Sequence, residues 1–434
     1  MKSPRATAAA ANASATGAIV LRGGKLLTIT HGVIEDGVLV MENGKITAVG
    51  KTGSVSIPKN AQVIDATGMT IYPGLIDSET HLGLTEVSAD KMTNDLVEKS
   101  DEIMPHMHVA DAFHAESSLI PVTRFNGVTN AIVSPTNEDT LPGQDSLVQL
   151  YGKNADEMLL VRDNALPLNF TGEQRRNESF EHAKFPFTRM GMASQLRQTF
   201  IDAQDYAKKW DAYRKAQSEP SSEKSGDKKD EKKKPEEPKH DLKFEALLPY
   251  LEGKKPVVVE AEEPNDIETA MGLAKEFNLK VVLNGVTHSS SILDEVAAYK
   301  VPVIISGLYI EPHDDERYDA VFSLPAELAK RGVKLAFATN DAHNVRNLPY
   351  EAGYAVGFGL PYDEALKALT INPAEIWGVA DQLGSLDVGK SATVVVANGD
   401  PLDVKTDVKH VFIAGHEVPM VTKQTILRDE YSAK

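Results

Sequence analysis

Residues 71–86 decide the fold, and they read Ile-Tyr-Pro-Gly-Leu-Ile-Asp-Ser-Glu-Thr-His-Leu-Gly-Leu-Thr-Glu. The Pro-Gly pair is a turn signal, and the apolar residues after it predict a short buried strand. Side chains alternate along a strand, so we expect Asp77, Glu79 and His81 to share one face. Three groups able to bind a metal or move a proton, at the carboxyl end of a strand, are typical of the catalytic end of a β/α barrel.

Short apolar runs and glycine-containing turns precede this segment. The runs 18–22 and 26–30 flank Gly23-Gly24, which we expect to form a turn. Asn43-Gly44 joins two further apolar runs and is a strong signal for a hairpin. This pattern predicts a small antiparallel β unit over residues 18–70.

Strand and helix patterns alternate after the segment, which predicts a parallel sheet with right-handed crossovers. Repetition of the unit over this length favours a closed barrel. We expect single helices over 109–126 and 187–217. The clearest strand patterns lie at 127–135, 256–260, 280–284, 302–306 and 334–338.

Charge and composition exclude several classes of function. The chain has 434 residues, a formal net charge of -17 and no cysteine. The acidic balance argues against nucleic acid and against an anionic membrane surface as partners. Disulfides and thiolate metal sites are excluded. No run reaches the roughly 18 apolar residues of a spanning helix, so we expect a soluble protein.

Two segments read as solvated chain. Residues 1–17 are rich in Ala, Ser and Thr and lack an apolar signal core. We expect a flexible tail, left after removal of a signal, and therefore slightly favour a periplasmic or other extracytoplasmic location over the cytoplasm. Residues 219–240 hold seven lysines, seven acidic residues and no apolar residue. This composition predicts a disordered charged insertion.

Residues 73–82 resemble the signature of the amidohydrolase superfamily, Pro-Gly-Leu-Ile-Asp-x-His-x-His-Leu. His81 matches the second histidine, whereas Glu79 replaces the first. Residues 127–135 resemble the second strand of that superfamily, and residues 363–375 and 383–396 its last helix and the return into the β unit. The resemblance covers roughly residues 18–425 and is strongest to the imidazolonepropionase-like and prolidase-like hydrolases.

The resemblance implies a fold and a division into domains. It implies a (β/α)8 TIM-like barrel over 71–382, interrupted by 219–240. Residues 18–70 and 383–425 would together form a small β-sandwich domain, with tails at 1–17 and 426–434. Members of the superfamily often assemble as homo-oligomers, which we also expect here.

Metal ligands are also implied, but the ligand set is degenerate in this chain. The family uses two histidines on strand one, a carboxylated lysine or glutamate on strand four, histidines on strands five and six, and an aspartate on strand eight. His81 and Asp341 match this pattern, whereas Glu79 and Glu260 replace histidines. The resemblance thus implies one divalent ion, Zn²⁺, Mn²⁺ or Mg²⁺, on these four residues. No lysine occurs in the candidate fourth strand, 165–170, so a two-metal centre is not expected.

Three further candidates flank this set: Asn284 at the strand-six position, His288 four residues later, and Glu262 beside Glu260. A hydrogen-bonded rim histidine or a solvated strand end would explain several of these residues equally well. The resemblance implies hydrolysis of amide or cyclic amide C–N bonds of a small-molecule substrate by metal-activated water. Asp341 and Glu79 would be the catalytic groups, with no organic cofactor. The alternative is an inactive relative that binds a small molecule or a partner subunit.

Overall fold

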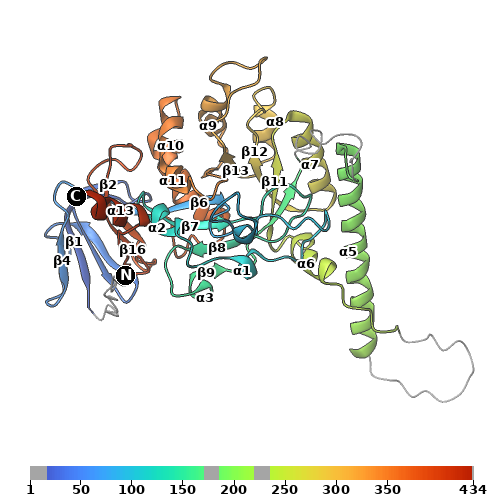
Figure 1. Cartoon of the computed structure of the whole chain (residues 1–434), viewed down its shortest axis with the longest axis horizontal. Helices are drawn as coiled ribbons and strands as arrows, with labels where there is room; N and C mark the ends of the chain where they lie inside the picture. Colours follow the sequence, from blue (N-terminus) through green and yellow to red (C-terminus); the bar gives the residue numbers. More distant parts are fainter. Residues whose placement is uncertain (1–16, 171–184, 219–234, 433–434) are drawn as a thin grey trace, which may run out of the picture.

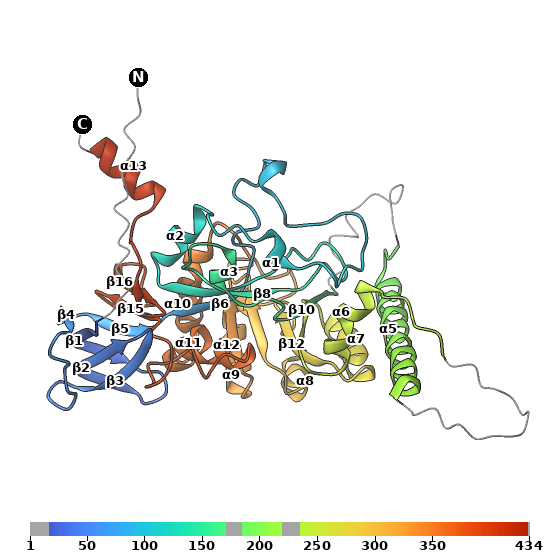
Figure 2. The same cartoon turned by 90° about the horizontal axis from the view of Figure 1, so that it is seen from below.

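The structure is a computed structural model that describes residues 17–170, 185–218 and 235–432. A sheet of strands from both ends of the chain lies at one end of the molecule, and alternating strands and helices fill the rest (Figure 1). The long helix α5, Arg189–Ser218, lies at the opposite end from that sheet in both views (Figure 2). The tail 1–16 and most of the insertion, 219–234, lie outside the described residues.

The terminal segments share one sheet. Strand order in this sheet is β17-β16-β15-β5-β1-β2-β3, with β4 paired to β1. The strands from residues 18–73 therefore lie beside those from residues 394–417, and the division of the chain into domains stays a prediction. The strands are β1 Ile19–Leu27, β2 Val33–Glu42, β3 Lys45–Lys51, β4 Gln62–Asp65, β5 Thr70–Pro73, β15 Val394–Ala397, β16 Val408–Ile413 and β17 His416–Glu417.

A bend in β1 replaces the turn expected at Gly23-Gly24. The first half of β1 pairs with β4 and the second half with β5, and the register shifts on both sides of Gly24. Gly23 has φ +84°, and a Cβ on Gly24 would lie 2.7 Å from Ile71 Cδ1. Glycine thus lets a single strand bend between two partners, where the sequence indicated two strands and a turn.

The β/α part contains two hydrogen-bonded sheets. One has the order β6-β7-β8-β9, and the other is the all-parallel run β10-β11-β12-β13-β14. The strand patterns at 256–260, 280–284, 302–306 and 334–338 are confirmed as β11 to β14. The strands are β6 Leu75–Thr80, β7 Val128–Val133, β8 Ser146–Gln149, β9 Leu159–Val161, β10 Leu166–Asn169, β11 Pro256–Ala261, β12 Lys280–Gly285, β13 Val303–Ser306 and β14 Leu335–Ala338.

These ladders do not form the regular closed ring of eight parallel strands that was expected. The strand β8 runs antiparallel to both β7 and β9. The connection 134–145 contains no helix, and a parallel return usually needs a helical crossover. At the other edge, Asn340 N donates to Glu79 O at 3.0 Å and His81 N to Asp341 O at 3.2 Å. The chain after β14 therefore lies directly against the end of β6.

Helices connect most of the parallel strands. The helix predicted over 187–217 is confirmed as α5, whereas the single helix predicted over 109–126 is wrong. Two short helices stand there, because Pro121 lacks an N–H and is accommodated only in the first turn of a helix. The other helices are α1 Val109–Ala112, α2 Leu119–Arg124, α3 Ala155–Met158, α6 Leu242–Leu251, α7 Pro264–Glu276, α8 Leu293–Ala298, α9 Ala320–Lys330, α10 Leu348–Gly357, α11 Tyr362–Leu369, α12 Ile371–Ile376 and α13 Lys423–Ser432.

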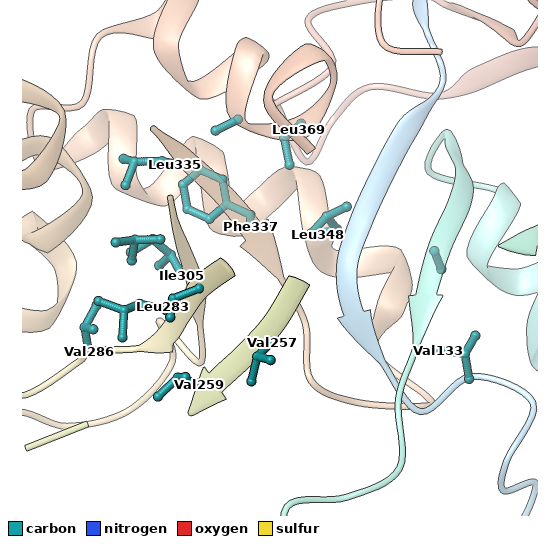
Figure 3. Close-up of a cluster of buried hydrophobic side chains, with 14 of the residues drawn as sticks. Val133, Val257, Val259, Leu283, Val286, Ile305, Leu335, Phe337, Leu348 and Leu369 are labelled. Carbon is teal, nitrogen blue, oxygen red and sulfur yellow. The ribbon is translucent and has the colours of Figure 1, made fainter. Parts of the chain in front are cut away.

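Both faces of the parallel strands are buried. Val257 and Val259 of β11 belong to an outer hydrophobic core, where they lie near Leu283 and Ile305 (Figure 3). Val258 belongs to an inner core that includes Trp377. The inner core also contains the equivalent residues of the next strands, Val282, Ile304 and Ala336. Side chains alternate along a strand, so the next inward positions are at the carboxyl ends, where Glu260, Asn284 and Ser306 stand.

We predict that deleting residues 219–234 leaves stability nearly unchanged. This segment has no apolar residue to bury, so we expect its removal to change the unfolding free energy by less than ~1 kcal/mol. Urea denaturation of the deleted and full-length proteins measures the difference. Residues 235–240 are kept, because His240 packs on Trp210 and lies 2.5 Å from Glu245 Oε1. A loss of several kcal/mol would contradict the prediction.

Candidate active site

Two buried carboxylates at the carboxyl ends of the strands lie close enough to interact electrostatically. Glu79 lies near the end of β6 and is 6% exposed, and Glu260 lies near the end of β11 and is 7% exposed. The Asn284 amide donates to Glu79 Oε2, and the Asn137 amide donates to Glu260 Oε1. Ser306 Oγ in turn donates to Asn284 Oδ1 at 3.1 Å. Each carboxylate is thereby held by one amide N–H.

Burial and mutual repulsion disfavour ionisation of this pair. Burial, followed by the nearby charge of Glu260, raises the pKa of Glu79 well above its usual value. Burial also raises the pKa of Glu260 to about 7, against the hydrogen bond from Asn137, which lowers it. Two interacting carboxyls of this kind titrate as one unit. Burial and mutual repulsion thus both favour the protonated form of the pair.

The local backbone of β6 brings Glu79 into this interior. Ile76 faces the inner core, and strict alternation from it would turn Glu79 away from that core. The register with β7 shifts between Asp77 and Thr80, as at a β-bulge. The irregularity explains how Glu79 reaches Asn284, and such re-aimed side chains are common beside active sites.

Asp77 is fully buried and bonded to the backbone of Glu79. Its Oδ1 accepts from Glu79 N and Thr339 N, both at 3.1 Å, and its Oδ2 accepts from Thr339 Oγ1 at 2.6 Å. Burial raises the pKa of Asp77 to about 7, although these hydrogen bonds lower it. Asp77 therefore ties the end of β6 to the end of β14.

Asp145 is an acidic residue of this site that the sequence reasoning did not select. Its side chain is buried, and burial raises its pKa well above the usual value. Its charge also raises the pKa of Glu79. In the part of the chain that the structure describes, Asp145 Oδ1 has no hydrogen-bond partner. No recognisable motif surrounds Asp145 in the sequence.

Asp341 and His81 stand apart from the acid pair in their bonding. Asp341 Oδ1 accepts from His343 N at 2.6 Å and Asn344 N at 3.1 Å, and Oδ2 accepts from Asn344 Nδ2 at 2.9 Å. Burial acts to raise the pKa of Asp341, but the bonds from Asn344 and His343 together lower it. His81 Nδ1 lies 2.8 Å from Ser134 O, and burial lowers the pKa of the ring.

The remaining candidates divide between two places. Glu262 lies close enough to raise the pKa of Glu260 and so borders the acid pair. His288 instead contacts Glu316, with Nδ1 2.9 Å from Oε2, and stacks on His313 at 3.6 Å between ring centroids. The structure thus brings together Glu79, Glu260 and Asn284 and groups His288 with residues from a different loop.

Several similarities to known proteins agree with this geometry. The sequence model of the Amidohydrolase family matches residues 271–418 of this chain. An amidohydrolase of Thermotoga maritima MSB8 has 28% identity and a TM-score of 0.81, and the match covers 92% of this chain and 99% of that one. The amidohydrolase tasK of Hapsidospora irregularis is 25% identical over 87% of this chain, which spans only 39% of that relative. A Xaa-Pro dipeptidase shares the fold, with 14% identity, a TM-score of 0.52 and coverage of 93% and 100%.

The fold, the buried polar residues at the strand ends and these similarities together define an amidohydrolase-like β/α scaffold. These similarities support placing the chain in the amidohydrolase superfamily. Members of this family usually bind a divalent metal ion. Within residues 17–170, 185–218 and 235–432, no helix is long and apolar enough to cross a membrane.

The four predicted metal ligands are not gathered into one group of ligand atoms in the described structure. Among the described residues, the one group of three or more candidate ligands is His288, His313 and Glu316, so Glu79, His81, Glu260 and Asp341 do not form such a group. One oxygen of each acid-pair carboxylate accepts a hydrogen bond from an amide N–H. Both oxygens of Asp341 are engaged by its own turn. We therefore derive no chemical step through a metal at this position.

A substitution at Asp341 separates two roles for its carboxylate. If the Asp341 carboxylate carries a proton in the reaction, Asp341→Asn should lose turnover by ~10²–10⁴-fold. If the carboxylate only holds its own turn, the substitution should lower the unfolding free energy by about 1–3 kcal/mol, because the new amide nitrogen cannot accept the hydrogen bond from Asn344 Nδ2. We expect the second result, with turnover within about tenfold of the parent. Urea denaturation and amide hydrolysis, measured on the same preparation, distinguish the two.

Proposed function

We propose that this chain hydrolyses amide or cyclic amide C–N bonds of a small molecule, with Glu79 and Glu260 as the acid–base pair. The observation that carries the proposal is the electrostatic interaction of these two buried carboxylates at the carboxyl ends of β6 and β11. Active sites of β/α barrels lie at this end of the strands. A pair that shares one proton near neutral pH supplies both an acid and a base.

The step needs no group beyond the chain, the substrate and water. The ionised member of the pair takes a proton from water as its oxygen attacks the carbonyl carbon. The protonated member gives its proton to the leaving nitrogen as the C–N bond breaks. The products are a carboxylic acid and an amine, so atoms and charges balance. Asn284 and Asn137 hold the two carboxylates in place, which reduces the cost of orienting them.

Family membership supports the reaction type, and the relatives suggest the substrate class. The matched neighbours include a Xaa-Pro dipeptidase, and short matches to this chain include an imidazolonepropionase, 44% identical over 64 residues. We therefore place dipeptide-like and cyclic amides first among the substrates. The expected homo-oligomer remains a proposal alongside this one.

A second candidate function is an inactive relative that binds a small molecule or a partner subunit. The specific observation in its favour is that Asn284 and Asn137 bond to the carboxylates standing at former ligand positions. Buried polar groups that hydrogen-bond to one another in this way also occur in networks with a purely structural role. The two functions differ in one measurable property, which is turnover of an amide.

Amine release from dipeptides, N-acyl amino acids and small cyclic amides tests the proposal. The parent protein should turn over at least one of these compounds many times. A protein that binds one of them, for example by calorimetry, but releases no amine from any would support the inactive relative and overturn the proposal.

A further inference from the structure

A compact group of two histidines and a glutamate lies on two loops outside the acid pair. His288 follows β12, and His313 and Glu316 lie between β13 and α9. Their candidate ligand atoms all lie within 4.8 Å of one another. Both loops leave the carboxyl ends of parallel strands, so the group stands at the same end of these strands as Glu260 of β11. Whether this group binds a metal ion does not depend on whether the chain hydrolyses amides.

The group is held in place by further contacts. Glu316 Oε2 accepts from His313 N at 3.0 Å, and Ser290 Oγ donates to Glu316 Oε1 at 3.1 Å. The side chains of His288 and Glu316 are only 7% and 10% exposed. A second carboxylate borders the group, because Glu263 Oε1 lies 3.6 Å from His313 Nδ1. Residues from three connections thus converge on one point.

From this arrangement we infer that His288, His313 and Glu316 bind one divalent transition-metal ion of the Zn²⁺ type. Two imidazoles and one carboxylate suit Zn²⁺ and Co²⁺ better than Mg²⁺ or Ca²⁺, which prefer oxygen alone. Metal–ligand bonds of about 2.1 Å place tetrahedral ligand atoms roughly 3.4 Å apart. Binding therefore needs only a small closure of the group.

Three protein ligands leave one tetrahedral position for water or for a ligand group. Such an open position is typical of zinc sites that do chemistry, whereas structural sites are usually closed. The ion would also join the loop after β12 to the loop after β13. Of this group only His288 was a candidate from the sequence, four residues after Asn284, which stands at the expected histidine position. His313 and Glu316 were not among the predicted ligands.

Metal binding tests the inference without any substrate. Chelator-treated, full-length protein is titrated with Zn²⁺ by calorimetry and with Co²⁺ by visible absorption. We expect one ion per chain, and a higher melting temperature with Zn²⁺, because an ion that binds the folded state stabilises it. Glu316→Gln and His313→Ala should each weaken binding by more than about 10-fold. His313 is 43% exposed, so its removal should leave the fold intact, as circular dichroism checks.

The matched control is His410→Ala. His410 also contacts a glutamate, with Nδ1 2.6 Å from Glu417 Oε1, but it lies in the terminal sheet and has no third ligand in the described structure. This variant should bind Zn²⁺ like the parent. No stoichiometric binding by the parent, or equal binding by the parent, Glu316→Gln and His313→Ala, would overturn the inference. Neither result depends on whether the chain hydrolyses an amide.

Discussion

Glu79→Gln should lower amide turnover by ~10²–10⁴-fold while the protein stays folded. Glutamine keeps the shape and can still accept the hydrogen bond from Asn284, but it cannot carry a proton. The substitution also removes one of two repelling acids, so stability should not fall. The initial rate of amine release at pH 7, measured at saturating substrate, gives the effect on turnover itself.

A matched control for this substitution is available in Glu351→Gln. Glu351 of α10 is another buried glutamate, 4% exposed, that lies outside the acid pair. Its replacement should leave turnover near that of the parent. Glu79→Gln with parental turnover, or an equal loss in both variants, would contradict the role assigned to Glu79.

Glu351→Gln should make the protein more stable at pH 9, by on the order of 3 kcal/mol, and change little at pH 5. Burial, followed by the charges of Asp77 and Asp341, raises the pKa of Glu351 from 4.5 to about 9. Its Oε2 is buried with no partner in the described part of the chain. An ionised carboxylate is therefore strongly disfavoured there.

The direction of the pH effect follows from proton counts. Between about pH 4.5 and 9 the unfolded chain has lost this proton, whereas the folded protein keeps it. The folded state binds more protons, so stability falls as pH rises through this window. Glutamine cannot ionise and removes this loss. Urea denaturation of the parent and of Glu351→Gln at pH 5 and pH 9 measures the difference in unfolding free energy. An equal difference at the two pH values would contradict the raised pKa of Glu351.

Much of the fold is predictable because its signals are local. Residues 71–86 identify the first barrel strand, and the apolar runs between 256 and 338 identify the parallel strands that form the second sheet. The bend at Gly23-Gly24 and the antiparallel β8 depend on which strands pair, which local pattern does not specify. The sequence therefore predicts where strands and helices lie better than it predicts which strands pair.

The sequence pointed to the acidic residues of the candidate site but not to the residues that hydrogen-bond to them. Glu79 and Glu260 stand out because they follow apolar strands. Asn137 and Asp145 come from a connection without a recognisable motif, so only the folded chain shows that they reach the same place. Tertiary contacts also decide that His288 meets Glu316 rather than the acid pair. Ligand roles for Glu79, His81, Glu260 and Asp341 stay predictions.

The most direct test is amine release by the parent and by the double variant Glu79→Gln/Glu260→Gln at pH 7, on the same dipeptides, N-acyl amino acids and cyclic amides. The parent should release amine over many turnovers from at least one compound. The double variant should lose that activity by at least ~10²-fold and still show the parental circular dichroism spectrum. No release by the parent from any compound, or equal release by the two proteins, would contradict the assignment of the acid pair as an amide-hydrolysing centre.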